Sequence, residues 1–130
     1  MIDLILKRSI YLLVLLVPLV LISGPALPDI CISVSSLLFI ILSVKKLDFE
    51  KFKNIFFIIF LLWNLYLIIN SLTSEHFDFS IRSSLFYFRF GVFSLCVWYC
   101  LENFDNFIKY FSIILLLSLM IVTIDGLIEY

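Results

Sequence analysis

Residues 84–101 read SLFYFRFGVFSLCVWYCL, and Arg89 is the one charged residue in this stretch. A guanidinium keeps its proton in every protein environment, so Arg89 stays charged wherever the fold places it. On insertion scales, an arginine at the centre of a membrane helix costs about 2.5–3.5 kcal/mol unless it finds a partner or water. The neighbouring side chains predict a membrane helix, and the cost of its charge makes Arg89 the first candidate for a functional residue.

The composition of the whole chain agrees with a membrane protein. Hydrophobic residues make up 64% of the 130 residues and charged residues 15%, whereas soluble domains average roughly 45–50% and 25%. A chain of this length could not bury so much apolar surface from water, so we expect membrane lipid to cover it. The net charge is −1 and no basic face is visible, so nucleic acid is not an expected partner.

Five apolar segments predict five transmembrane helices at residues 9–27, 30–44, 54–72, 84–101 and 107–124, with a polar loop at 71–83. A helix rises 1.5 Å per residue, so these segments extend about 22–28 Å, which suffices for a bilayer when aromatic and long basic side chains lie at the ends. We therefore predict an all-α fold, a polytopic membrane helical bundle.

The first two segments predict a hairpin, because Gly24, Pro25 and Pro28 interrupt the apolar sequence between them. Lys7 and Arg8 before the first segment resemble the start of a secretory signal, but no clean cleavage site follows, so a retained signal anchor is expected. Two interpretations of the hairpin stay open. Either both segments span the membrane, which we prefer, or the hairpin re-enters from one side.

The positive-inside rule predicts that the N-terminus is cytoplasmic. With this orientation Arg82 is the one loop cation outside, and the inner side holds Lys7, Arg8, Lys45, Lys46, Lys51, Lys53 and Lys109. Segment 84–101 then enters from the outside, which places Arg89 about five residues below the outer surface.

Arg82 and Arg89 are separated by seven residues, close to two helical turns, so they share a face about 10 Å apart if the helix reaches back to Arg82. Paired guanidinium groups suit a diphosphate or a carboxylate, which arginine binds bidentately. The alternative is that Arg89 reaches outward or pairs with a carboxylate and binds no ligand. The predicted partner is Asp125, where Gly126 would allow close helix approach, and the second choice is Asp29.

Other polar residues give weaker signals. His76 is the only histidine, and it is interpreted as a solvated loop residue because no nucleophile or second metal ligand accompanies it. Cys96 and Cys100 share a helix face and are interpreted as small hydrophobic residues, not as a redox or metal pair. Asn64 is predicted to form interhelical hydrogen bonds, as are Ser33 and Ser36. No metal site is predicted.

Three stretches resemble bacterial O-antigen ligase and O-antigen polymerase-like membrane proteins. They are LISGPALPD at residues 21–29, SLFYFRFG at 84–91 followed by VWY at 97–99, and FIKYF at 107–111 leading into IDGLIEY at 124–130. Members of that family are several-fold longer, so the resemblance implies that residues 1–130 form the N-terminal transmembrane portion of a longer membrane domain.

The resemblance implies a polyprenol-dependent glycosyltransferase in the bacterial inner membrane. Such enzymes move a glycan from undecaprenyl diphosphate at the periplasmic face, without a nucleotide sugar, metal or other cofactor. A ligase transfers the glycan to a lipid A-core acceptor, and a polymerase transfers it to another glycan. Arg89 and Arg82 match the family's diphosphate-binding arginines in location and type. The catalytic base is expected beyond Tyr130, so this portion alone is expected to be inactive.

Two other functions stay open. Transporters or flippases also place charges in their helices, but typically near the midplane and between repeated halves, and no internal repeat is visible here. A small structural membrane subunit would use a pair between Arg89 and Asp125 for assembly alone.

Overall fold

The computed structural model describes residues 2–47, 49–74 and 77–128, and every regular element within these ranges is helical. The elements are α1 (Ile2–Val20), η1 (Leu21–Ser23), α2 (Ala26–Lys46), η2 (Glu50–Lys53), α3 (Ile55–Leu72), α4 (Phe77–Phe86), α5 (Phe88–Asn103) and α6 (Phe107–Ile128), where η1 and η2 are short 3-10 helices. The predicted all-α fold is confirmed.

Five helical segments in the described ranges are long and apolar enough to cross a membrane: Asp3–Ser23, Ala26–Lys46, Ile55–Leu72, Phe77–Asn103 and Phe107–Ile128. The chain is therefore a multi-pass membrane protein. The first two segments have 21 residues each, about 31 Å of helix, which matches a hydrocarbon core of about 30 Å. This length favours full spanning of the first hairpin over re-entry.

The predicted boundaries are wrong mainly where a helix continues into polar sequence. Residues 77–83, predicted as loop, form most of α4, and α1 begins at Ile2 instead of at residue 9. Lysine and arginine are good helix formers, and Asp78 in the first turn of α4 suits the positive end of the helix dipole. Hydropathy therefore located the apolar part of each helix, whereas the helix itself extends further.

The turn between α1 and α2 depends on Gly24, whose φ of +105° lies in the left-handed region that favours glycine. Pro25 follows as the N-cap of α2. The predicted hairpin is confirmed, although α2 begins at Ala26, four residues before the expected start.

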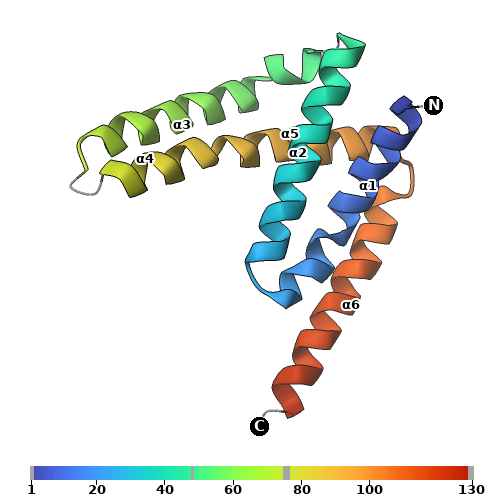
Figure 1. Cartoon of the computed structure of the whole chain (residues 1–130). Helices are drawn as coiled ribbons and strands as arrows, with labels where there is room; N and C mark the ends of the chain where they lie inside the picture. Colours follow the sequence, from blue (N-terminus) through green and yellow to red (C-terminus); the bar gives the residue numbers. More distant parts are fainter. Residues whose placement is uncertain (1, 48, 75–76, 129–130) are drawn as a thin grey trace.

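The helices form two groups (Figure 1). α1, α2 and α6 lie together, while α3 and the α4–α5 helix run side by side and extend away from them, so that α5 passes across α2. The core lies where α1, α2 and α5 meet. Its fully buried apolar side chains are Ile10, Val14, Phe39, Leu42, Val92, Cys96 and Cys100.

Small side chains allow α2 and α5 to approach closely at this crossing. Ser35 and Cys96 are both fully buried, and the Cys96 thiol donates to the carbonyl oxygen of Ser35 across 3.9 Å. Cys96 and Cys100 are free thiols with no exposed surface. Their interpretation as small hydrophobic residues is confirmed by this burial.

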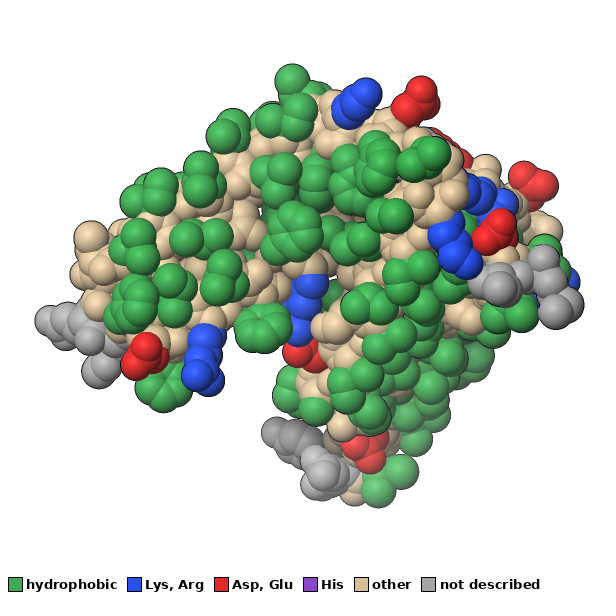
Figure 2. Space-filling view, turned by 45° about the horizontal axis from the view of Figure 1, so that its top comes forward, with side chains coloured by type: hydrophobic (Ala, Val, Ile, Leu, Met, Phe, Trp, Pro, Cys, Tyr) green, Lys and Arg blue, Asp and Glu red, His purple; other side chains and the backbone are tan. Residues whose placement is uncertain are grey.

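The face of the molecule drawn in Figure 2 carries many hydrophobic side chains. Large hydrophobic side chains are exposed along all five membrane segments, and α6 exposes nearly its whole length. In a soluble protein so much exposed apolar surface would drive aggregation, but for a membrane helix it is the surface that lipid or another helix covers.

Candidate functional site

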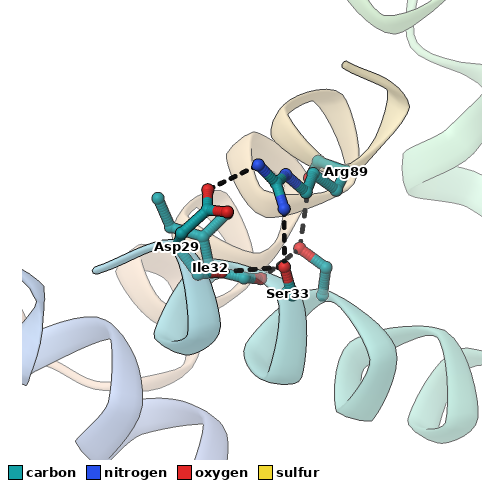
Figure 3. A network of polar contacts seen from close by, with 5 residues as sticks. Asp29, Ile32, Ser33 and Arg89 are labelled. Carbon is teal, nitrogen blue, oxygen red and sulfur yellow. Dashed lines mark hydrogen bonds and ion pairs between the residues drawn. The ribbon is translucent and has the colours of Figure 1, made fainter. Parts of the chain in front are cut away.

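Arg89 lies where α5 crosses the beginning of α2 (Figure 3). Its Nη2 is 2.5 Å from Oδ1 of Asp29, and its Nη1 donates to Oγ of Ser33 at 3.1 Å. The Arg89 side chain is 24% exposed and the Asp29 side chain 45%, so the ion pair lies at the edge of the protein. The crossing of two helices places the charge beside its counter-ion.

The partner of Arg89 is therefore Asp29, the second choice from the sequence, and the first choice, Asp125, is wrong. Asp125 is exposed and forms no ion pair with any residue the structure describes. A Cβ atom at Gly126 would meet nothing within 4 Å, so α6 makes no close approach there. Similar depth in the membrane suggested the pair, but depth does not say which helices are neighbours.

Serines of α2 complete the contact with α5. Ser33 donates to the carbonyl oxygen of Asp29 at 2.8 Å, which holds its oxygen toward Arg89. The Ser36 hydroxyl lies 3.1 Å from the carbonyl oxygen of Arg89 and 2.7 Å from that of Ile32. The predicted interhelical hydrogen bonds of Ser33 and Ser36 are confirmed. Ser33 binds the guanidinium of Arg89 and Ser36 binds its backbone carbonyl oxygen, so both the side chain and the backbone of Arg89 are held to α2.

Two phenylalanine rings flank the guanidinium. Cζ of Arg89 lies 5.6 Å from the ring centroid of Phe86 and 5.1 Å from that of Phe90. Arginine over an aromatic ring is favourable, more so where water is scarce. Nε of Arg89 is buried and has no hydrogen-bond partner in the described ranges.

A pocket of about 660 Å³ opens beside this pair, lined by Asp29, Arg82, Ser83, Phe86, Tyr87, Arg89 and Phe90. Figure 2 shows the molecule hollowed between its two helix groups, with basic and acidic atoms in the hollow. Arg82 and Arg89 thus share one face of the α4–α5 helix, as their spacing predicted. We call this space the basic pocket.

Charge in the basic pocket is positive but partly neutralised. Its two guanidinium groups and the Asp29 carboxylate leave one net positive charge. Arg82 is exposed and forms no ion pair within the described part of the chain. The Asp29 carboxylate is already bonded to Arg89. Of the two arginines in the basic pocket, Arg82 is therefore the one whose guanidinium can bind an anion.

The helix that carries both arginines is interrupted at Tyr87, between α4 and α5. Asn64 of α3, buried to 4% exposure, lies at this interruption. With its amide oriented by its partners, its nitrogen donates to the carbonyl oxygen of Ser84 at 3.0 Å and its oxygen accepts from the amide of Phe88 at 2.9 Å. Ser84 and Phe88 are four residues apart, so a continuous helix would bond them to each other.

Asn64 is confirmed as an interhelical hydrogen-bonding residue, but the interruption that it occupies was missed. No proline or glycine marks position 87, and kinks at such residues are the ones that a sequence reveals. A helix can also be interrupted by a polar side chain that inserts into its hydrogen bonds. The signal for this in the sequence was Asn64, a polar residue within an apolar segment. The Asn64 oxygen accepts a hydrogen bond from the backbone N–H of Phe88. This N–H is therefore not available to a ligand, and the positive charge of the basic pocket comes from side chains.

Of the remaining candidates, Cys96 and Cys100 do not line the basic pocket. His76 lies outside the described residues. Within the described ranges no three His, Cys, Asp or Glu side chains are grouped as metal ligands. Comparisons with protein-family models, curated proteins and solved structures found no match to this chain.

Proposed function

We propose that this chain is the N-terminal membrane portion of a glycosyltransferase of the O-antigen ligase type in the bacterial inner membrane. It would take part in moving a glycan from undecaprenyl diphosphate to a lipid A-core acceptor at the periplasmic face. The observation that carries the proposal is that Arg82 and Arg89 line one pocket between two membrane segments. An O-antigen polymerase uses the same donor, and the pocket fits that enzyme equally well.

The two arginines have different roles in this proposal. Arg82 binds the diphosphate directly, because its guanidinium is exposed and makes no ion pair with a described residue. Arg89 is held by Asp29 and Ser33 and adds positive charge deeper in the pocket. Arginine suits this task because its fork of N–H groups matches two phosphate oxygens at once.

During transfer an acceptor hydroxyl oxygen bonds to the anomeric carbon of the glycan, and the bond from that carbon to the diphosphate breaks. The leaving diphosphate gains negative charge, which guanidinium groups fixed in advance stabilise. The residues that line the basic pocket include no candidate base, because Asp29 is bonded to Arg89. In this proposal the chain binds the donor, and residues outside the pocket deprotonate the acceptor.

A structural membrane subunit is the second candidate, and one observation favours it. The charge of Arg89 is already matched by Asp29 and Ser33, so the network would serve helix assembly without any ligand. The two candidates differ at Arg82, which contributes to ligand binding in the first and to nothing in the second.

Photo-crosslinking in membranes tests the proposal. Tyr87 lines the basic pocket and is 48% exposed, whereas Tyr66 on α3 is 57% exposed and lies outside it. With p-benzoylphenylalanine at either position, labelled undecaprenyl-diphosphate glycan should crosslink at position 87 and not at 66. Arg82→Gln should reduce the crosslink at 87. Equal labelling at both positions, or no effect of Arg82→Gln, would contradict donor binding and favour the structural subunit.

A further inference from the structure

The C-terminal half of α6 is uncovered in the structure. Ser118, at 5% exposure, is the last buried residue of α6, and every described residue after it is exposed. Figure 1 shows this half of the helix extending past the turn between α1 and α2. Residues 119–124 are five apolar residues and one threonine, so the surface suits lipid or another helix. The charged residue that follows them, Asp125, decides between the two.

Asp125 lies on the face of α6 that packs against the protein nearer the start of the helix. Phe107 is buried there, with its ring 5.9 Å from the ring of Tyr11 on α1. Asp125 is 18 residues after Phe107, which is five turns of an α-helix. It is also seven residues after Ser118, close to two turns. The packed face of α6 thus continues to Asp125, beyond the part that the rest of the chain covers.

The charge of Asp125 needs a partner in the membrane. Lys109 and Asp125 enclose 15 residues without charge, about 22 Å of helix, which is shorter than a hydrocarbon core of about 30 Å. A centred helix therefore puts both charges inside the hydrocarbon. Lys109 can extend its ammonium group to the membrane surface, whereas the aspartate side chain is too short to do so. Asp125 forms no ion pair with a described residue, and a membrane charge without a partner is unfavourable.

The first hairpin shows which partner satisfies such a charge. Asp29, in the first turn of α2, is paired with Arg89 of a crossing helix. Asp125 is in the last turn of α6, at the negative end of the helix dipole, where a nearby cation is favourable. Gly126 beside it leaves the backbone bare, since a Cβ atom there would meet nothing within 4 Å. Glycine lets a second membrane helix approach closely.

We infer that the exposed half of α6 is a docking surface for a transmembrane helix of a partner chain, which carries an arginine or lysine at the depth of Asp125. The partner helix packs against Ile121 and Asp125, and its cation pairs with the Asp125 carboxylate. A second copy of this chain matches less well, because Arg82, the one described cation on the predicted outer side without an ion pair, lines the basic pocket. This inference goes beyond the proposed function and does not depend on diphosphate binding.

Photo-crosslinking of the 130-residue chain in phosphatidylcholine vesicles tests the docking surface. The probe is a synthetic leucine–alanine transmembrane helix with one arginine near its end. p-Benzoylphenylalanine replaces either Ile121, on the packed face, or Leu119, about 200° away around the helix; these residues are 47% and 61% exposed. The arginine helix should crosslink at least about fivefold more at position 121 than at 119. Equal crosslinking at the two positions would overturn the inference.

Charge variants separate a specific pair from general apolar contact. Asp125→Asn should lower crosslinking of the arginine helix at position 121 about fivefold. Asp125→Arg should restore it when the synthetic helix carries glutamate in place of arginine. The matched control is Asp78→Asn, because Asp78 is an exposed acidic residue on α4, and it should change nothing. Unchanged crosslinking in Asp125→Asn, or an equal loss in the control, would overturn the inference.

The crosslinked products identify the other possible occupants of the surface. Crosslinks between two copies of the chain that exceed those to the arginine helix at equal concentration would assign the surface to a dimer. Crosslinks at position 121 to phosphatidylcholine alone would show that lipid covers it. Either result would overturn the partner helix, and neither would affect donor crosslinking at Tyr87.

Discussion

The charge of Arg89 inside an apolar segment is matched by a carboxylate and a hydroxyl that α2 brings to it. The pair with Asp29 is neither buried nor fully exposed, with side chains 24% and 45% accessible. Exposed pairs contribute about 0–1 kcal/mol, whereas removing one partner of a buried pair costs about 3–5 kcal/mol. The Arg89 pair lies between these limits, and its hydrogen bond to Ser33 adds a second partner for the same guanidinium.

Asp29→Asn should therefore lower the free energy of unfolding by about 1–3 kcal/mol, the range for hydrogen bonds to charged groups. Thermal unfolding in detergent micelles measures the change. The matched control is Asp125→Asn, which should change nothing because the exposed Asp125 has no ion pair among the described residues. A larger loss in the control than in Asp29→Asn would contradict the pairing.

Among the elements, the α4–α5 helix shows how one side chain can shape a site on another helix. Asn64 of α3 bonds to both Ser84 and Phe88 across the interruption at Tyr87, which is two residues before Arg89. A carboxamide carries one donor group and one acceptor, like a peptide unit, so it can occupy a gap in a helix without leaving polar groups unsatisfied. The direction of Arg89 into the pocket thus depends on a neighbouring helix.

The packing of α3 on α5 depends on Gly91, and a matched pair of glycine substitutions tests this. Gly91→Ala should cost about 1–3 kcal/mol of unfolding free energy, because its Cβ would overlap the Phe60 ring and force a shift. Gly126→Ala in α6 should stabilise by about 0.4–1 kcal/mol, since nothing lies within 4 Å and alanine favours a helix.

Unfolding measurements in micelles compare the two variants directly, and the double variant Gly91→Ala with Phe60→Leu should recover much of the loss. Equal stability of Gly91→Ala and Gly126→Ala would show that Phe60 moves without cost. That result would contradict the close contact between α3 and α5.

The elements also show what the sequence could and could not predict. Hydropathy located all five membrane segments, because their apolar cores are long and separated by charged or turn-forming residues. Spacing along one helix placed Arg82 and Arg89 on one face correctly. Hydropathy could not choose Asp29 over Asp125, because that choice depends on which helices cross. The interruption at Tyr87 was equally hidden, since its cause is Asn64, which is 23 residues earlier in the sequence.

For the whole molecule, the topology decides on which side of the membrane the basic pocket opens, and the proposed function requires the outer side. The charge distribution predicts that the turn after α3 faces outward, and Thr73 in that turn is exposed. In a variant whose native cysteines are replaced by alanine, Thr73→Cys should react with an impermeant thiol reagent applied to intact cells. Lys53→Cys, at the opposite end of α3, should react only after lysis. The reverse pattern would invert the topology and place the basic pocket on the cytoplasmic side.

The pair between Arg89 and Asp29 also has a consequence for how the chain is made. Its two residues are 60 positions apart, so at about 5–20 residues per second roughly 3–12 s separate their synthesis. During that interval the first hairpin holds an acidic side chain near the membrane surface without its cation. The hairpin must therefore tolerate Asp29 at its turn, where water is available, until α5 is inserted. The position of Asp29 in the first turn of α2, and not deeper, is what the order of synthesis requires.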